Sequence, residues 1–100
     1  MSRPELLSQD ALRHHLVLLP TWESDGTTIR KTFILQTFVA AIGFVNAIAI
    51  LAETMDHHPD IRIYGWNKVD IAISTHDQGG LTELDMDLAS KIDEIGRAHV

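Results

Sequence analysis

The first third of the chain predicts a short helix followed by a β-hairpin. Apolar residues recur at helical spacing after Ser8, a favourable N-cap residue, so we expect a helix over about residues 9–17. Asp25-Gly26 is a strong turn signal. Because β-branched and aromatic residues follow it, we expect two strands, at about 20–24 and 27–35.

The middle of the chain predicts one long helix, over about residues 37–55. Its expected core stripe has helical spacing and consists of Phe38, Ala41, Ile42, Val45, Ile48, Ala49, Ala52 and Met55. The opposite side is also mostly apolar, with Val39, Ala40, Gly43, Ala47 and Ile50. A helix that is apolar all round is buried all round, and one sheet covers only one side. We therefore expect a second subunit on the other side or, alternatively, the two other helices of the chain.

The second half of the chain predicts another pair of strands. His57-His58-Pro59 ends the long helix, because proline disfavours the helical conformation in the residue before it. Strands are expected at 61–66 and 69–75, joined by Asn67-Lys68. The later strand alternates apolar and polar residues, as a half-buried strand does.

A last helix begins at Thr82, which forms a capping-box-like pair with Asp85. Its apolar positions are Leu84, Leu88, Ile92 and Ile95. The element order is therefore α-β-β-α-β-β-α. Since hairpins join the strands, we expect an α+β fold, a four-stranded antiparallel sheet with three helices packed on one face. At 100 residues, the chain is expected to form a single domain, 1–100.

Charge and composition exclude several classes of function. Fourteen acidic residues against eight Lys and Arg give a net charge of −6, so we expect no nucleic-acid partner and no binding to anionic lipid. With no cysteine, the chain has neither disulfides nor thiol chemistry. The N-terminus lacks the apolar run of a signal peptide, and we expect a cytoplasmic location.

One uncharged stretch raises the question of a membrane. Residues 33–52 carry no charge over 20 positions, which is long enough to span a bilayer. Gln36, Thr37 and Asn46 interrupt the stretch, and six of its residues are Ala or Gly. Its hydropathy is therefore modest, and we expect no membrane insertion.

Histidine is the residue type that points to chemistry. Of the six in the chain, His57 and His58 follow the long helix and His76 follows the last strand. In this topology the two ends can meet, and three imidazoles in one cleft would supply acids and bases near neutral pH. Alternatively, His57 only caps the helix C-terminus and His76 only hydrogen-bonds a loop.

The residues around these histidines also have two interpretations each. With Asp77 the histidines are suitable metal ligands, but adjacent histidines point apart and no His-x-His spacing occurs, so we expect no metal. Glu53, one helical turn before His57, either orients that imidazole or is a solvated surface acid. Asp85 acts in the site or only as a capping partner, and Trp66 stacks on a flat ligand or only fills a rim.

Together these residues form one spaced pattern. It consists of Glu53-x3-His57-His58-Pro59, Trp66, Asn67-Lys68-Val69-Asp70-Ile71, Ser74-Thr75-His76-Asp77, Gly79-Gly80-Leu81-Thr82 and Asp85. In this pattern, and in Leu19-Pro20-Thr21-Trp22, the chain resembles the pterin-4a-carbinolamine dehydratase (4a-hydroxytetrahydrobiopterin dehydratase) family over about residues 12–95.

The resemblance implies a fold, an assembly, a reaction and a site. The fold is the same α+β sandwich, and the assembly is a homodimer or homotetramer, here through the 37–55 helix. The reaction is that of a lyase that removes water from 4a-hydroxytetrahydrobiopterin to give quinonoid dihydropterin, recycling the cofactor of aromatic amino acid hydroxylases. It needs no metal or other cofactor. The implied catalytic residues are His57, His58 and His76, with His57 and His76 as the acid–base pair. The implied pterin-binding residues are Glu53, Pro59, Trp66, Thr75, Asp77, Gln78 and Asp85.

Two other functions are compatible with the same resemblance. One is a non-catalytic dimerisation or docking module, which would not need all three histidines. The other is a related pterin-handling protein that acts on a different substrate.

Overall fold

The computed structural model describes residues 4–99, and its elements follow the predicted order. They are α1 (Gln9–Val17), β1 (Glu23–Ser24), β2 (Ile29–Ile34), α2 (Phe38–Met55), β3 (Asp60–Tyr64), β4 (Lys68–Ile73), the 3₁₀ helix η1 (His76–Gln78) and α3 (Glu83–His99). The strands form one antiparallel sheet in the order β1-β2-β4-β3. The predicted α+β fold is confirmed.

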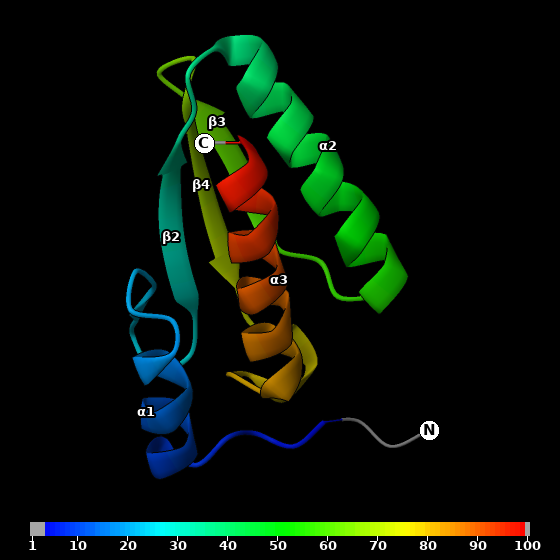
Figure 1. The fold of residues 1–100 in the computed structure, drawn as a ribbon. Coiled ribbons are helices and arrows are strands. Elements are labelled where there is room, and N and C mark those ends of the chain that lie inside the picture. The colour runs from blue at the N-terminus through cyan, green and yellow to red at the C-terminus, as the bar shows by residue number, and fades with distance from the viewer. Residues whose placement is uncertain (1–3, 100) are drawn as a thin grey trace.

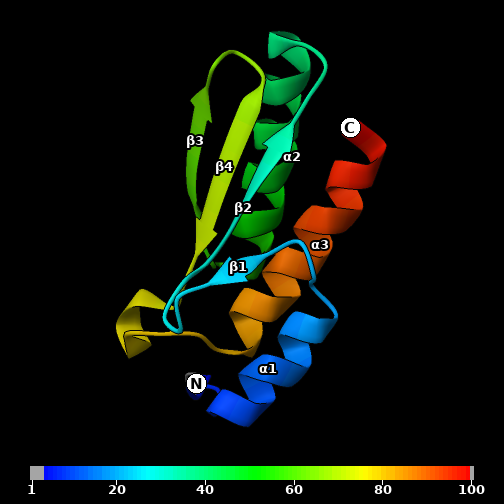
Figure 2. The same ribbon diagram turned by 90° about the vertical axis from the view of Figure 1, so that its left-hand side faces the viewer.

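The molecule has two layers (Figure 1). α2 and α3 lie side by side over one face of the sheet, and α1 packs at its end, beside the start of α3. In the turned view, the sheet lies in front of α2 and no helix of residues 4–99 covers its near face (Figure 2). Between the layers, the inward side chains of β2 and β4 meet α2 and α3. The core includes Ile29, Phe33, Phe44, Ile48, Val69, Ile71, Ile73, Leu88 and Ile92.

The first hairpin is shorter than the predicted strands at 20–24 and 27–35. The Trp22 N–H donates to the Leu19 carbonyl at 3.1 Å, so the chain turns there and β1 begins only at Glu23. At the hairpin tip, the Asp25 carboxylate accepts the N–H groups of Thr27 and Thr28 at 2.9 and 2.8 Å. Those two bonds lower the pKa of Asp25, and they hold both threonines in the turn rather than in β2.

The second hairpin also departs from the prediction of strands at 61–66 and 69–75. Gly65 and Trp66 have φ of 54° and 60°, the left-handed conformation of a turn. β3 therefore ends at Tyr64, and Trp66 lies in the connection instead of in the strand. The chain after β4 bends into η1 at His76, and α3 continues to His99, past the last predicted apolar position, Ile95.

The long helix α2 begins where it was predicted but buries a different stripe. Thr37 is its N-cap and accepts the Ala40 N–H at 2.9 Å. Its buried residues are Ala41, Phe44, Ile48 and Ala52. Phe44 was missing from the predicted stripe, whereas Phe38, Ile42 and Ala49 were placed in it and are exposed. The ring centroid of Phe44 lies 4.8 Å from that of Phe33, and this contact fixes the rotation of the helix.

The outer side of α2 is apolar and exposed in the single chain. Val39, Ile42 and Ile50 have 80%, 40% and 70% of their surface exposed. Within residues 4–99, α2 is the one helix that is long and apolar enough to cross a membrane, although its inner side packs on β4 and α3. Such an exposed apolar face is typical of a surface that contacts another protein chain or a membrane.

Candidate active site

The C-terminal end of α2 presents two histidines in different surroundings. Asp56, at φ 49°, adopts the left-handed conformation and ends the helix, and the His57 N–H still donates to the Ala52 carbonyl at 3.0 Å. This turn directs His57 inward, where it is buried, and leaves His58 exposed. Pro59 then carries the chain into β3.

The far end of β4 supplies the third histidine. Thr75 is paired with Gly80, and its N–H donates to the Gly80 carbonyl at 2.8 Å. This bridge closes a loop around η1, with Gly79 in the left-handed conformation at φ 70°. His76, the first residue of η1, is exposed, and its imidazole has no hydrogen bond or ion pair with the rest of residues 4–99.

These two segments enclose a cavity of about 240 Å³. It is lined by Pro4, Asp56, His57, His58, Ser74, Thr75, His76, Asp77, Gln78 and Leu84. The structure therefore brings the three predicted histidines together, along with Thr75, Asp77 and Gln78. The loop after a helix and the loop after a strand meet at one end of the fold, which is the arrangement expected from the topology.

Asp85, on the first turn of α3, lies behind His57. The Asp85 side chain is fully buried, and its Oδ1 lies 2.6 Å from His57 Nε2. Its Oδ2 accepts the Thr75 hydroxyl at 2.8 Å and the Thr82 N–H at 2.7 Å. The Thr82 hydroxyl in turn lies 2.8 Å from the Thr75 hydroxyl and accepts the Leu84 N–H at 3.3 Å. The capping role and the imidazole contact of Asp85 are therefore both present.

This network determines which nitrogen of His57 carries a proton. Asp85 Oδ2 accepts the Thr75 hydroxyl and the Thr82 N–H, so this carboxylate acts as an acceptor in the network. An ionised Asp85 can only accept at Oδ1, so the donor is Nε2–H of His57. The free nitrogen of the neutral His57 ring is then Nδ1, which can exchange a proton with a ligand in the cavity.

Glu53 contacts a different histidine from the one expected. Its Oε1 lies 2.6 Å from Nε2 of His58, not of His57. The left-handed Asp56 ends the helical spacing that would have placed Glu53 beside His57. Both partners are exposed, with 77% of the Glu53 side chain and 57% of the His58 side chain accessible to solvent, so this pair is weak.

Four of the seven predicted binding residues do not line the cavity. Glu53 and Asp85 each contact one of its histidines instead. Pro59 follows His58 but does not line the cavity. Trp66 is 60% exposed in the β3–β4 connection. β3 runs away from the histidines for its whole length, so Trp66 lies at the opposite end of the sheet (Figure 2).

Sequence reasoning missed four of the lining residues. Asp56 and Ser74 flank predicted site residues, and proximity along the chain was the available signal for both. Leu84 was assigned to the core of the last helix. Pro4 reaches the cavity because the Leu7 N–H donates to the Leu81 carbonyl at 2.9 Å, a contact between distant segments that has no signal in the sequence.

Metal binding at these histidines has no geometric support. Within residues 4–99, no group of three or more His, Cys, Asp or Glu side chains is placed to hold a metal ion. The contacts of His57 and His58 are each made to one carboxylate.

Comparison with known proteins identifies the family of the chain. The sequence model of the family described as "Pterin 4 alpha carbinolamine dehydratase" matches residues 5–95. The chain belongs to this family. Proteins from Roseiflexus sp. and Sulfurisphaera tokodaii are 51% and 43% identical over 89 residues, which are 89% of this chain and 95% of each relative. A Rhizobium meliloti protein is 45% identical over 101 residues, and the match covers 98% of this chain and 95% of the Rhizobium protein. Each is named "Putative pterin-4-alpha-carbinolamine dehydratase".

Solved structures of the pterin dehydratase type share the fold. The crystal structure of a transcriptional coactivator/pterin dehydratase from Brucella melitensis has a TM-score of 0.85 at 34% identity, over 92% of this chain and 99% of its own. A pterin dehydratase-like protein identified as a RuBisCO assembly factor in the alpha-carboxysome has a TM-score of 0.61 at 22% identity, over 75% and 86% of the two chains. At that identity the second likeness concerns the fold alone. Membership of the pterin-4a-carbinolamine dehydratase family supports a dehydratase activity in general.

Proposed function

We propose that this protein is a hydro-lyase that removes water from 4a-hydroxytetrahydrobiopterin and releases quinonoid dihydropterin. The observation that carries the proposal is the cavity in which His57, His58 and His76 meet. Its product is the form from which the cofactor of aromatic amino acid hydroxylases is regenerated. The protein performs the reaction without a metal or cofactor of its own.

The reaction needs one acid and one base. The C4a–O bond breaks, and the leaving hydroxyl takes a proton to become water. The ring nitrogen bonded to C4a loses its proton, and the electron pair of that N–H bond forms the C=N bond of the product. Imidazoles perform both transfers near pH 7, and each contributes about 10²–10⁴-fold to the rate.

We assign the roles of base, acid and orienting residue from the contacts that each histidine makes. His57, held by Asp85 through Nε2, accepts the ring proton at Nδ1. His76, whose imidazole is exposed at the cavity, protonates the leaving hydroxyl. His58, held by Glu53, orients the substrate. The pterin edge contacts Thr75, Asp77 and Gln78 beside His76, and Trp66 of the same chain takes no part.

A stopped-flow dehydration assay tests this proposal. A pterin-dependent hydroxylase generates the carbinolamine in place, and we expect the protein to accelerate formation of quinonoid dihydropterin. His76→Ala should lower this rate by at least about 10²-fold, and the His57→Ala, His76→Ala double variant should abolish the acceleration. His14→Ala, which removes an exposed histidine of α1, is the matched control and should leave the rate unchanged.

Absence of acceleration by the folded wild-type protein would contradict the proposal. In that case a related pterin substrate becomes the favoured alternative, and binding of reduced pterins to the same cavity would identify it. An unchanged rate in His76→Ala would remove His76 from the mechanism while leaving the lyase assignment intact.

The proposal includes self-association through α2. The exposed apolar side chains on its outer face favour a homodimer or homotetramer in which a second copy covers them. The exposure of these apolar side chains also favours the alternative function, in which the protein is a docking module for another protein. The cytoplasmic location remains a prediction.

A further inference from the structure

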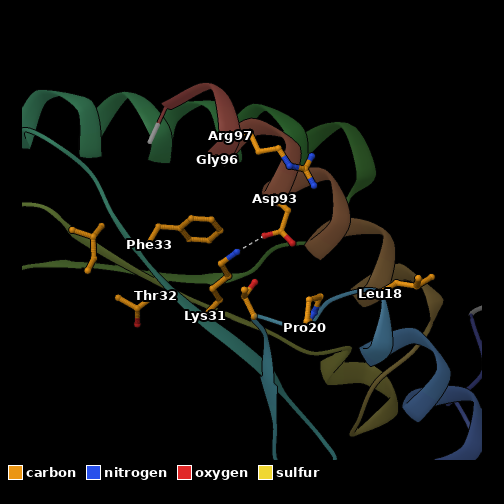
Figure 3. A pocket seen from close by; sticks show the side chains of 10 residues that line it. Leu18, Pro20, Lys31, Thr32, Phe33, Asp93, Gly96 and Arg97 are labelled. Carbon is orange, nitrogen blue, oxygen red and sulfur yellow. Dashed lines mark hydrogen bonds and ion pairs between the residues drawn. The ribbon is translucent and has the colours of Figure 1, made fainter.

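A second cavity, larger than the one at the histidines, lies away from them. It has a volume of about 700 Å³, within the usual range for small-molecule sites, and shares no lining residue with the histidine cavity. Its walls are β2, the chain that leads into β1, and the C-terminal half of α3 (Figure 3). No residue of α2 lines it.

A fixed ion pair forms one wall of this cavity. Lys31 Nζ donates to Asp93 Oδ1 at 2.7 Å, and only 18% and 15% of the two side chains are exposed. The Trp22 indole N–H is shared between both Asp93 oxygens at 3.1 Å. Lys31 Nζ also lies 4.4 Å from the centre of the Phe33 ring. With both charges neutralised, this wall presents no net charge to a ligand.

Among the other lining side chains, Leu18 and Ile34 are apolar and exposed, whereas Phe33 is apolar and buried. Leu18 and Ile34 have 79% and 59% of their surface exposed, and the Phe33 ring lies between β2 and α3 (Figure 3). A Cβ on Gly96 would lie 2.8 Å from this ring, so glycine at that position lets α3 hold the ring in place. These side chains fit an apolar, planar group.

The unpaired charge of the cavity is positive. Arg97 lines it and is exposed, and its guanidinium has no ion pair within residues 4–99. In a chain with a net charge of −6, this cavity is lined by two cationic side chains and one carboxylate. A guanidinium binds a carboxylate through two parallel hydrogen bonds.

We propose that this cavity is a second ligand site, for a small organic anion with an aromatic body and one carboxylate. The carboxylate binds Arg97, and the body lies over the exposed side chains of Leu18 and Ile34. The hydroxyls of Thr21 and Thr32, beside the cavity, select ligands with a further polar substituent. The site is independent of the dehydratase proposal, because it shares no residue with the histidine cavity.

Titration of ¹⁵N-labelled protein with 2-naphthoate tests the site, with neutral 2-naphthamide as the matched probe. We expect saturable amide shifts at Thr21, Thr32, Ile34 and Arg97. Arg97→Gln should weaken the binding of 2-naphthoate by about tenfold and leave the affinity for 2-naphthamide unchanged, because only the carboxylate interacts with the charge of Arg97. The control variant is Arg30→Gln, which removes an exposed arginine at the start of β2 outside this cavity and should change neither affinity.

Three outcomes would overturn the proposal. The first is a linear, non-saturating response up to the solubility limit of 2-naphthoate. The second is a set of shifts on the outer face of α2 instead of around the cavity, which would indicate unspecific apolar binding. The third is an equal loss of affinity for both probes in Arg97→Gln, which would show that Arg97 does not bind the carboxylate.

Discussion

At the scale of single residues, Asp85 shows what a sequence pattern can and cannot decide. Spacing to Thr82 predicted a capping pair, and the structure confirms it through the bond from the Thr82 N–H. The contact with His57 joins residues 28 positions apart, and local spacing carries no information about it. One oxygen of Asp85 serves each role, so the two interpretations of this residue do not exclude each other.

Replacement of Asp85 by asparagine should disable His57 without unfolding the protein. The amide oxygen can still accept the Thr82 N–H, but its NH₂ group would face Nε2 of His57 and force the proton onto Nδ1. The base would then have the wrong tautomer, and we expect kcat to fall by at least about 10²-fold with KM little changed. Imidazole ¹⁵N shifts measure the tautomer directly, Nε2–H in the wild type and Nδ1–H in Asp85→Asn.

Glu53→Gln is the matched control for that experiment. It makes the same carboxylate-to-amide change at the exposed partner of His58, where water can replace the lost bond. Its effect on stability should stay below about 1 kcal/mol, and the tautomer of His57 should not change. An Nδ1–H tautomer in the wild type, or a normal kcat in Asp85→Asn, would contradict the role assigned to Asp85.

At the scale of elements, helix starts were predictable and strand ends were not. Ser8 caps α1 as its sequence position indicates, and Thr37, at the expected start of the long helix, caps α2. A capping side chain acts within its own first turn, so local spacing can indicate it. The strand end at Tyr64 depends on two left-handed residues, and one of them, Trp66, is a residue type that rarely adopts this conformation. Gly65 was the available turn signal, but the prediction placed the connection two residues later, at Asn67-Lys68.

The rotation of α2 shows the same limit. Apolar residues surround this helix, so its period does not determine which stripe faces the sheet. The choice is made by packing, because Phe44 meets Phe33 of β2, and no local pattern contains that contact. The proximity of the three histidines was predicted better than the core stripe, because they lie at element ends that the topology brings together.

The Thr37 cap gives a quantitative test at this scale. Thr37→Ala removes the acceptor of the Ala40 N–H and should lower the free energy of unfolding by about 1 kcal/mol, measured by denaturant titration. Thr54→Ala in the same helix is the control, since its hydroxyl donates only to the Ile50 carbonyl of the previous turn. That change should be neutral or slightly stabilising, because alanine has the higher helix propensity. An equal loss of unfolding free energy in both variants would show that Thr37 is not a functional cap.

At the scale of the whole molecule, two exposed apolar regions differ in the charged side chains beside them. The outer face of α2 carries Val39, Ile42 and Ile50 with no charged side chain among them. The cavity beside α3 has apolar walls and the cation of Arg97. The outer face of α2, apolar except for the exposed Asn46, suits a copy of itself, because a twofold contact places like residues together, whereas the cavity suits a small anion. The outer face of α2, the histidine cavity and the second cavity therefore lie on different surfaces of the fold.

Ile50→Glu tests the assembly through α2. In an oligomer formed by this face, the new carboxylate would be buried without a partner, which costs several kcal/mol and should dissociate the wild-type assembly into single chains. Because Ile50 is 70% exposed in the single chain, the fold itself should survive. Val17→Glu makes the same change at a site on α1 that is 74% exposed, and it should leave the assembly intact. Sedimentation velocity measures the mass of each variant, and circular dichroism checks the fold. A wild-type protein that sediments as a single chain, or an Ile50→Glu variant of unchanged mass, would show that a second copy does not cover this face.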